Sequence, residues 1–157
     1  RDNDEIIGGQ GPSDLNGGEG DDHLTAGSGQ ATLDGGAGDD VIFGSEQADR
    51  IDGSAGNDYI SSLGGDDFVF GGNGDDTAVG GFGNDSLSGG SGADVLLGSA
   101  GHDRIRGGDG DDFLRGNGGR DRLIGELGED RYAGTESEID DIFGDTQTMG
   151  LPPFMAF

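Results

Sequence analysis

Aspartate recurs every nine residues along most of this chain, each time after a run of glycines. Representative copies read GGEGDDHLT (17–25), GGAGDDVIF (35–43) and GGDGDDFLR (107–115). Carboxylates are hard oxygen ligands, and a cation such as Ca²⁺ takes about six to eight oxygens. Because glycine has no side chain, the neighbouring backbone carbonyls can converge on the same ion. The recurrence therefore indicates repeated structural cation sites and not pairs of catalytic acids and bases.

A strict nonapeptide frame holds these aspartates in register. From residue 8 to residue 133 the chain divides into fourteen consecutive nonapeptides without insertion or deletion. Positions 1 and 4 are glycine and position 6 is aspartate in nearly every copy. The exceptions are Ala26 and Ser62 at position 1, Gln47 at position 4, and Ser13 and Ala31 at position 6. A turn that reverses the chain in six residues needs positive φ values, which glycine adopts at little steric cost.

Position 8 is apolar or aromatic in every copy. The residues there are Leu15, Leu24, Leu33, Ile42, Ile51, Ile60, Val69, Ala78, Leu87, Leu96, Ile105, Leu114, Leu123 and Tyr132. Side chains alternate across a strand, so position 8 is expected to point inward and positions 7 and 9 outward. Such a core is small, and stacked carboxylates repel one another. We therefore expect cation binding and folding to be a single event.

The composition excludes an ordinary globular core. Glycine accounts for 38 of the 157 residues, 29% of the chain is hydrophobic and the net charge is −25. A chain of this kind is disordered unless periodicity and bound cations order it. It has no cysteine, which excludes disulfides and thiolate metal sites. The 33 acidic residues face 8 basic ones, which argues against nucleic acid or an anionic membrane as the partner.

The pattern G-G-x-G-x-D-x-U-x, in which U is a large apolar residue, resembles the RTX family. These are the haemolysin-type calcium-binding repeats of bacterial proteins exported by type I secretion. The resemblance covers residues 1–133. It implies an all-β fold, a right-handed parallel β-roll (β-solenoid) of about seven coils of 18 residues, two nonapeptides to a coil. It also implies that Ca²⁺ lies between turns stacked one coil apart.

Alternate turns lie on opposite edges of such a roll, so aspartates 18 residues apart stack. One edge carries Asp4, Asp22, Asp40, Asp58, Asp76, Asp94, Asp112 and Asp130. The other carries Asp49, Asp67, Asp85, Asp103 and Asp121, preceded by Ser13 and Ala31. These aspartates are the predicted metal ligands. We expect about eight to eleven Ca²⁺ ions, with the N-terminal end of the second edge empty or weakly filled.

The repeat divides the chain into two regions. Residues 1–133 are the predicted roll, a partial repeat over 1–7 followed by the fourteen nonapeptides. The tail, 134–157, leaves the frame and is expected to cap the open end of the roll; the alternatives are a linker or part of an export signal. Because the sequence begins with Arg1, we expect it to be a fragment of a longer protein. It shows no secretory signal peptide and no apolar run that would span a bilayer.

One outer face of the predicted roll is more apolar than the other. In alternate copies, positions 7 and 9 include Val41, Phe43, Tyr59, Val79, Val95, Leu97 and Phe113. The same positions of the remaining copies are mainly polar. A contiguous apolar patch indicates a contact surface, for a second roll, the tail or a neighbouring domain. The alternative is that branched and aromatic residues simply suit exposed strands.

No catalytic motif is present: the chain lacks HExxH, GxSxG and a P-loop. We therefore expect a non-enzymatic, calcium-binding module of a secreted, extracellular or cell-surface bacterial protein. On this hypothesis it folds on binding Ca²⁺ outside the cell and so aids export. One alternative is a structural or adhesive protein, such as surface-layer or biofilm material, assembling through the apolar face. Another is an accessory module of a secreted protease, lipase, epimerase or toxin.

Overall fold

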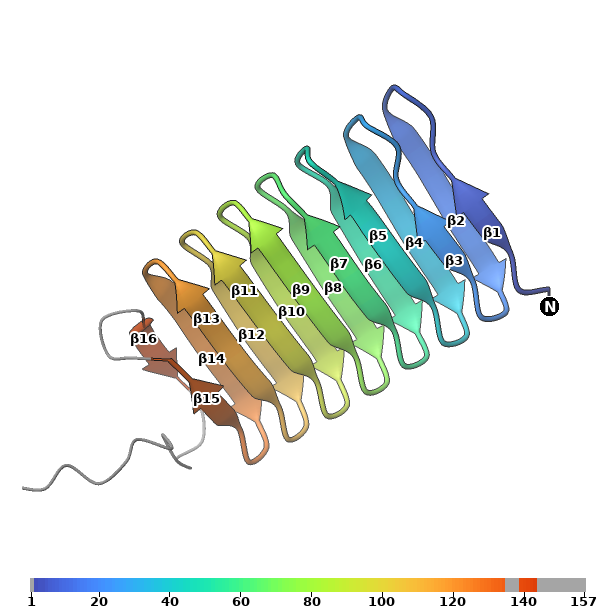
Figure 1. Ribbon diagram of the computed structural model, residues 1–157. Coiled ribbons are helices and arrows are strands. Elements are labelled where there is room, and N and C mark those ends of the chain that lie inside the picture. The colour runs from blue at the N-terminus through green and yellow to red at the C-terminus, as the bar shows by residue number, and fades with distance from the viewer. Residues whose placement is uncertain (1, 135–138, 144–157) are drawn as a thin grey trace, which may run out of the picture.

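The computed structural model describes residues 2–134 in full and residues 139–143 by their backbone. Over these residues the chain winds into a flattened coil made of two parallel sheets and no helix (Figure 1). Successive strands alternate between the sheets, so one sheet holds the odd-numbered strands and the other the even-numbered strands. The predicted fold class, an all-β parallel β-roll, is confirmed.

Both sheets contain eight described strands. The odd sheet consists of β1 (Glu5–Ile7), β3 (His23–Thr25), β5 (Val41–Ser45), β7 (Tyr59–Leu63), β9 (Thr77–Phe82), β11 (Val95–Ala100), β13 (Phe113–Gly118) and β15 (Arg131–Ala133). The even sheet consists of β2 (Ser13–Glu19), β4 (Ala31–Ala37), β6 (Arg50–Ala55), β8 (Phe68–Asn73), β10 (Ser86–Ser91), β12 (Arg104–Asp109), β14 (Asp121–Leu127) and β16 (Ile139–Phe143).

Each coil spans 18 residues, as the nonapeptide frame predicts. On the odd sheet Leu24 pairs with Ile42, and on the even sheet Ile51 pairs with Val69. Because the register is constant, every position of a nonapeptide lies beside the same position one coil away. Side chains at the same nonapeptide position therefore form rows along the roll, and the turns stack with their equivalent residues one coil apart.

The core is the predicted row of position-8 side chains, contributed by both sheets. Its fully buried members run from Leu24 to Leu123, and Tyr132 closes the C-terminal end at 8% exposure. Ile6 and Leu15, in the first coil, are only partly buried. The described residues contain no helix long and apolar enough to cross a membrane.

Exposed aromatic side chains lie on both outer faces of the roll. On the odd face, Phe43 lies between His23 and Tyr59, with ring centroids 5.6 and 6.1 Å away, and Tyr59 is 43% exposed. On the even face, which the sequence makes mainly polar, Phe68 and Phe70 are 57% and 41% exposed. Both faces therefore present exposed rings, and Phe68 on the even face is the most exposed Phe or Tyr at positions 7 and 9.

The even sheet continues beyond the last regular nonapeptide. Strand β16 pairs in parallel with β14, so that Asp141 lies beside Arg122, after a register shift between Asp121 and Arg122. Backbone pairing therefore reaches Phe143. Apart from Gly134 and the backbone of β16, the tail lies outside the described residues, and its predicted role as cap, linker or export signal stays a prediction.

Candidate metal sites

Eleven of the fourteen turns share one backbone conformation, in which positions 2 and 4 both have positive φ. Position 4 is glycine in all eleven, with φ between +114° at Gly65 and +143° at Gly101. A Cβ on Gly38 would overlap the carbonyl oxygen of Gly20, the same position of the preceding coil. Position 4 therefore requires glycine for two reasons, its φ and the closeness of a backbone oxygen.

The position-6 aspartates point into these turns and form two ladders along the edges of the roll. The long ladder contains Asp22, Asp40, Asp58, Asp76, Asp94, Asp112 and Asp130; the short ladder contains Asp49, Asp67, Asp85, Asp103 and Asp121. All twelve are at most 3% exposed. In each, Oδ1 accepts the backbone N–H of position 6 in the preceding coil, as in Asp40 to Asp58 at 2.8 Å. Asp4 is exposed in the first coil, and its N–H donates to Asp22 at 2.7 Å.

The second carboxylate oxygen, Oδ2, is buried without a hydrogen-bond partner among the described residues in most members of both ladders. These members are Asp22, Asp40, Asp58, Asp67, Asp76, Asp85, Asp94, Asp103, Asp112 and Asp130. In nearly every such turn the glycine at position 1 makes room for this oxygen, since a Cβ on Gly71 would overlap Oδ2 of Asp76. A buried carboxylate oxygen without a partner costs several kcal/mol as an order of magnitude. A cation is the group that would satisfy it.

Burial changes the acidity of these aspartates. Loss of hydration raises the pKa of Asp67, Asp76 and Asp112 from 3.8 to about 7, although the N–H bond to Oδ1 lowers it. The pKa of Asp58 and Asp103 rises to about 6 for the same first reason. Neighbouring carboxylates of the same ladder add to the increase. The metal-free turns therefore carry ionised groups at neutral pH only at a free-energy cost.

Asp49 differs from the other ladder members. Its Oδ2 accepts the backbone N–H of Ser45 at 2.6 Å, and the Ser45 hydroxyl lies 3.2 Å from Oδ1. Its turn has Gln47 in place of the position-4 glycine and lacks the positive φ values. The turns of Ser13 and Ala31 lack them too. Among the described residues, unpartnered Oδ2 atoms on the short ladder therefore begin at Asp67, the aspartate that follows Asp49.

A second set of side chains, at position 5, was not recognised in the sequence. These side chains accept the backbone N–H of position 5 in the following coil, in the opposite direction to the aspartate ladders. The acceptors are Asn3, Asp21, Asp39, Asn57, Asp66, Asp75, Asn84, His102 and Asp111. Each stacked turn is thus bonded to the coils on both sides. The recurrence of Asp or Asn at position 5 is the sequence feature from which these hydrogen bonds between coils could have been predicted.

The donors present fit a hard cation. Among the side chains of residues 2–134, no three His, Cys, Asp or Glu groups converge on one point, so a cation here would be held by aspartate together with backbone carbonyls. Ca²⁺ accepts such all-oxygen sets readily. A zinc site at His102 is disfavoured, because its Nδ1 already accepts the N–H of Arg120 at 2.9 Å.

Comparison with known protein families agrees with this geometry. The chain matches the family model of the RTX calcium-binding nonapeptide repeat (4 copies) over residues 1–33, 34–69, 62–96, 70–105 and 97–132. The matches extend over most of the sequence, and the chain belongs to this calcium-binding β-roll family. No curated protein sequence gives a significant match.

Proposed function

We propose that this chain is a calcium-dependent folding module whose two aspartate ladders are the metal ligands. The observation that carries the proposal is the repeated, buried Oδ2 that has no partner among the described residues. Eleven turns have the conformation that accompanies it. We propose about eight to eleven bound Ca²⁺ ions, and eleven divalent ions would carry +22 against the net charge of −25.

In this proposal, the two carboxylate oxygens of each aspartate and the turn glycines have different roles in binding the ion. Oδ1 of each aspartate aligns two coils by accepting an N–H, which leaves Oδ2 for the ion in every ladder member except Asp49, whose Oδ2 accepts the N–H of Ser45. Glycines at positions 1 and 4 keep the space between coils clear of side chains. When bound, Ca²⁺ supplies the positive charge that offsets the burial of the carboxylates. The binding free energy then becomes folding free energy, since the site does not exist in the unfolded chain.

We further propose that this coupling serves export. Where free Ca²⁺ is low, the charge of −25 and the small core favour the unfolded chain, which can pass through a narrow channel. Outside the cell, calcium modules bind with Kd of about 10⁻⁴–10⁻³ M, so the roll would form there. In this proposal the protein is secreted and bacterial, leaves by type I secretion, and contributes no catalytic group through this chain.

Circular dichroism with a calcium titration tests the proposed function. In EGTA the chain should be largely unstructured, and millimolar Ca²⁺ should restore the β signal cooperatively. Mg²⁺ at the same concentration is the control and should substitute poorly, because it demands tight octahedral geometry and holds its waters. Equal β content in EGTA and in Ca²⁺ would contradict the proposal.

A further inference from the structure

The outer face of the even sheet has opposite charges at its two ends. Its acidic side chains lie on the N-terminal strands β2, β4 and β6, and are Asp14, Asp34 and Asp52. Its basic side chains at the other end lie on β12 and β14, and are Arg104, Arg106 and Arg122. All six occupy position 7 or 9, which points outward. The exposed Phe68 and Phe70 lie between the two ends, on β8.

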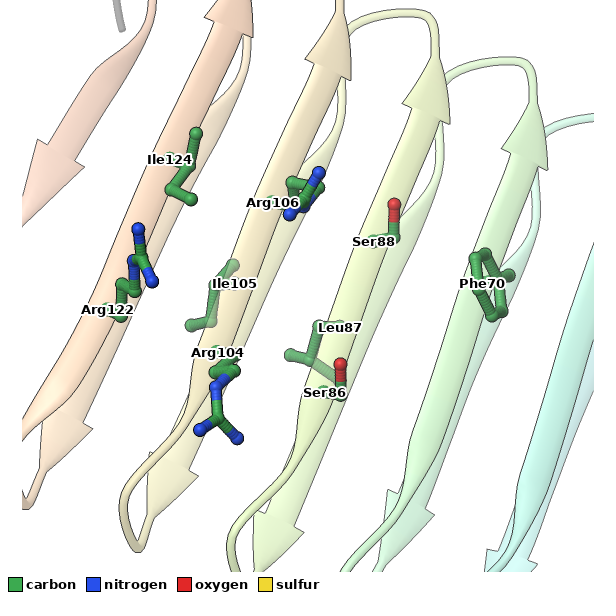
Figure 2. A pocket seen from close by; sticks show the side chains of 9 residues that line it. All are labelled: Phe70, Ser86, Leu87, Ser88, Arg104, Ile105, Arg106, Arg122 and Ile124. Atoms are coloured by element: carbon green, nitrogen blue, oxygen red, sulfur yellow. The ribbon is translucent and has the colours of Figure 1, made fainter. Parts of the chain in front are cut away.

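A shallow groove of about 400 Å³ is lined on one side by Phe70. Figure 2 shows Phe70 on one side, the short side chains of Ser86 and Ser88 along the middle, and the arginines of β12 and β14 on the other side. Within the molecule, Arg106 contacts Glu126 at 3.0 Å, and Arg50 lies 5.4 Å from the centre of the Phe70 ring. The face therefore combines raised aromatic rings, a trough and two charged ends.

We propose that this face binds the same face of a second copy of the chain, with the two rolls antiparallel. The twofold axis runs parallel to the strands, along β8. This axis places β2 over β14, β4 over β12, and β8 over itself. Asp14 then faces Arg122 of the second copy and Asp34 faces Arg106, while the Phe68 and Phe70 rings meet at the centre. Parallel rolls would instead place acid over acid and arginine over arginine.

The geometry is self-complementary, as a twofold interface requires. An acidic polymer could contact the arginines, but it would meet the aspartates on the same face. Seven strands about 4.8 Å apart and about 20 Å long give roughly 600 Å² per copy. The total of about 1,200 Å² reaches the lower end of stable interfaces. The dimer rests on the proposed function, because copies with a charge of −25 repel each other until Ca²⁺ is bound.

Sedimentation equilibrium of the full chain at about 100 µM in millimolar Ca²⁺ measures the association. The wild type should have twice the 15.8 kDa mass of one chain. Phe68→Ser with Phe70→Ser should weaken dimerisation by at least about tenfold, as expected for central interface aromatics. The matched control is Phe43→Ser with Tyr59→Ser on the odd face, which should stay dimeric.

A charge-swap pair tests the antiparallel orientation. Arg106→Glu with Arg122→Glu makes all four proposed contact positions (14, 34, 106 and 122) acidic, and Asp14→Arg with Asp34→Arg makes the same four positions basic. Each variant alone should be monomeric, and an equal mixture should form a heterodimer, since every facing pair is again of opposite charge.

Circular dichroism of the same samples separates this proposal from the proposed function. Loss of calcium-dependent folding would overturn the proposed function, whereas the oligomeric state decides the interface. A folded wild type that is monomeric at about 100 µM would overturn the interface. So would a dimer that survives Phe68→Ser with Phe70→Ser, one that is lost in the odd-face control, or charge variants that fail to associate when mixed.

Discussion

The two aspartate ladders start differently, although one nonapeptide frame runs through both. On the long ladder, every turn from Asp22 onward has the positive-φ conformation and a buried Oδ2 without a partner in the described part of the chain. On the short ladder, the first three turns lack that conformation, and the first Oδ2 for which residues 2–134 offer no partner belongs to Asp67. The roll therefore contains two kinds of turn, and the cation sites proposed above belong to the kind with positive φ at positions 2 and 4.

We call the eleven turns with positive φ at positions 2 and 4 cation-type turns, and those of Ser13, Ala31 and Asp49 exceptional turns. The exceptional turns show which residues a cation-type turn needs. The turns that contain Ser13 and Ala31 have glycine at position 4, Gly11 and Gly29, yet neither glycine has positive φ. The turn of Asp49 has the aspartate but Gln47 at position 4. Glycine and aspartate are therefore required together. Position 2 is less strict, because Ser54, Leu63, Ser99, Asn117 and Glu126 occupy it with φ between +70° and +86°.

The largest difference between the ladders should come from removing a carboxylate charge. Asp76→Asn deletes a buried Oδ2 with no partner among the described residues, whereas Asp49→Asn alters a carboxylate that Ser45 already satisfies. We expect Asp76→Asn to raise the Ca²⁺ concentration at the folding midpoint by more than about tenfold, and Asp49→Asn to have a much smaller effect. Calcium titrations by circular dichroism measure both. Equal effects would show that Oδ2 is not the ligand.

Acidification should act on the cation-type turns next. The pKa of Asp67, Asp76 and Asp112 is about 7 in the folded chain, raised from the ordinary aspartate value of 3.8 that applies when the chain is unfolded. A raised carboxyl pKa means that the metal-free fold binds more protons, so its stability falls as pH rises from about 4 to about 7. In EGTA, the β signal should therefore be stronger at about pH 4.5 than at about pH 7.5. In Ca²⁺ the trend reverses, because protons compete for the same oxygens.

Calcium titrations at two pH values are the control for this prediction. Ca²⁺ midpoints measured at about pH 5.5 and pH 7.5 should show weaker calcium binding at the lower pH. A β signal in EGTA that falls on acidification would mean that burial of these carboxylates does not oppose folding.

Two neighbouring exceptional turns of the short ladder, those of Ala31 and Asp49, should be convertible into cation-type turns. In the turn of Asp49, Gln47→Gly restores the position-4 glycine. In the turn one coil earlier, Ala31→Asp supplies the missing carboxylate and Ala26→Gly makes room for it at position 1. We expect the triple variant to bind one more Ca²⁺ ion than the wild type, counted by calorimetry or by metal analysis after dialysis. Ala26→Gly alone is the control and should add no ion, since it leaves one turn without its carboxylate at Ala31 and the next without its position-4 glycine at Gln47. An unchanged count in the triple variant would refute this requirement.

The smallest expected effect concerns backbone strain at position 2. Leu63 has φ +72° and its side chain is 40% exposed, so Leu63→Gly relieves strain at little loss of burial. We expect a gain of about 0.5–1 kcal/mol in the free energy of unfolding in Ca²⁺, after the larger unfolded-state entropy of glycine is deducted. Leu127→Gly is the control: Leu127 is 68% exposed without positive φ, and its replacement should destabilise. Urea unfolding compares the two.

Much of the fold follows from periodicity. Each nonapeptide contacts the coils beside it, so a period of nine with one apolar residue determines strand, turn, core row and 18-residue stacking. The inward direction of Ile42 and Ile51 and the separation of the two ladders are confirmed for this reason. Solenoids are predictable in this way because their contacts link residues a constant distance apart in the chain.

Only the tertiary structure shows which carboxylate oxygens are hydrogen-bonded and which aromatic rings are exposed. Sequence spacing places Asp49 on a ladder, but only the atomic structure shows that Ser45 satisfies its Oδ2 while that of Asp76 has no partner among the described residues. The same holds for the outer faces, where Phe43 is shielded by neighbouring rings and Phe68 is not. A repeat pattern specifies which residues lie beside one another. Hydrogen bonding and exposure also depend on where each backbone N–H and each ring points, and that is set by φ, ψ and packing across coils.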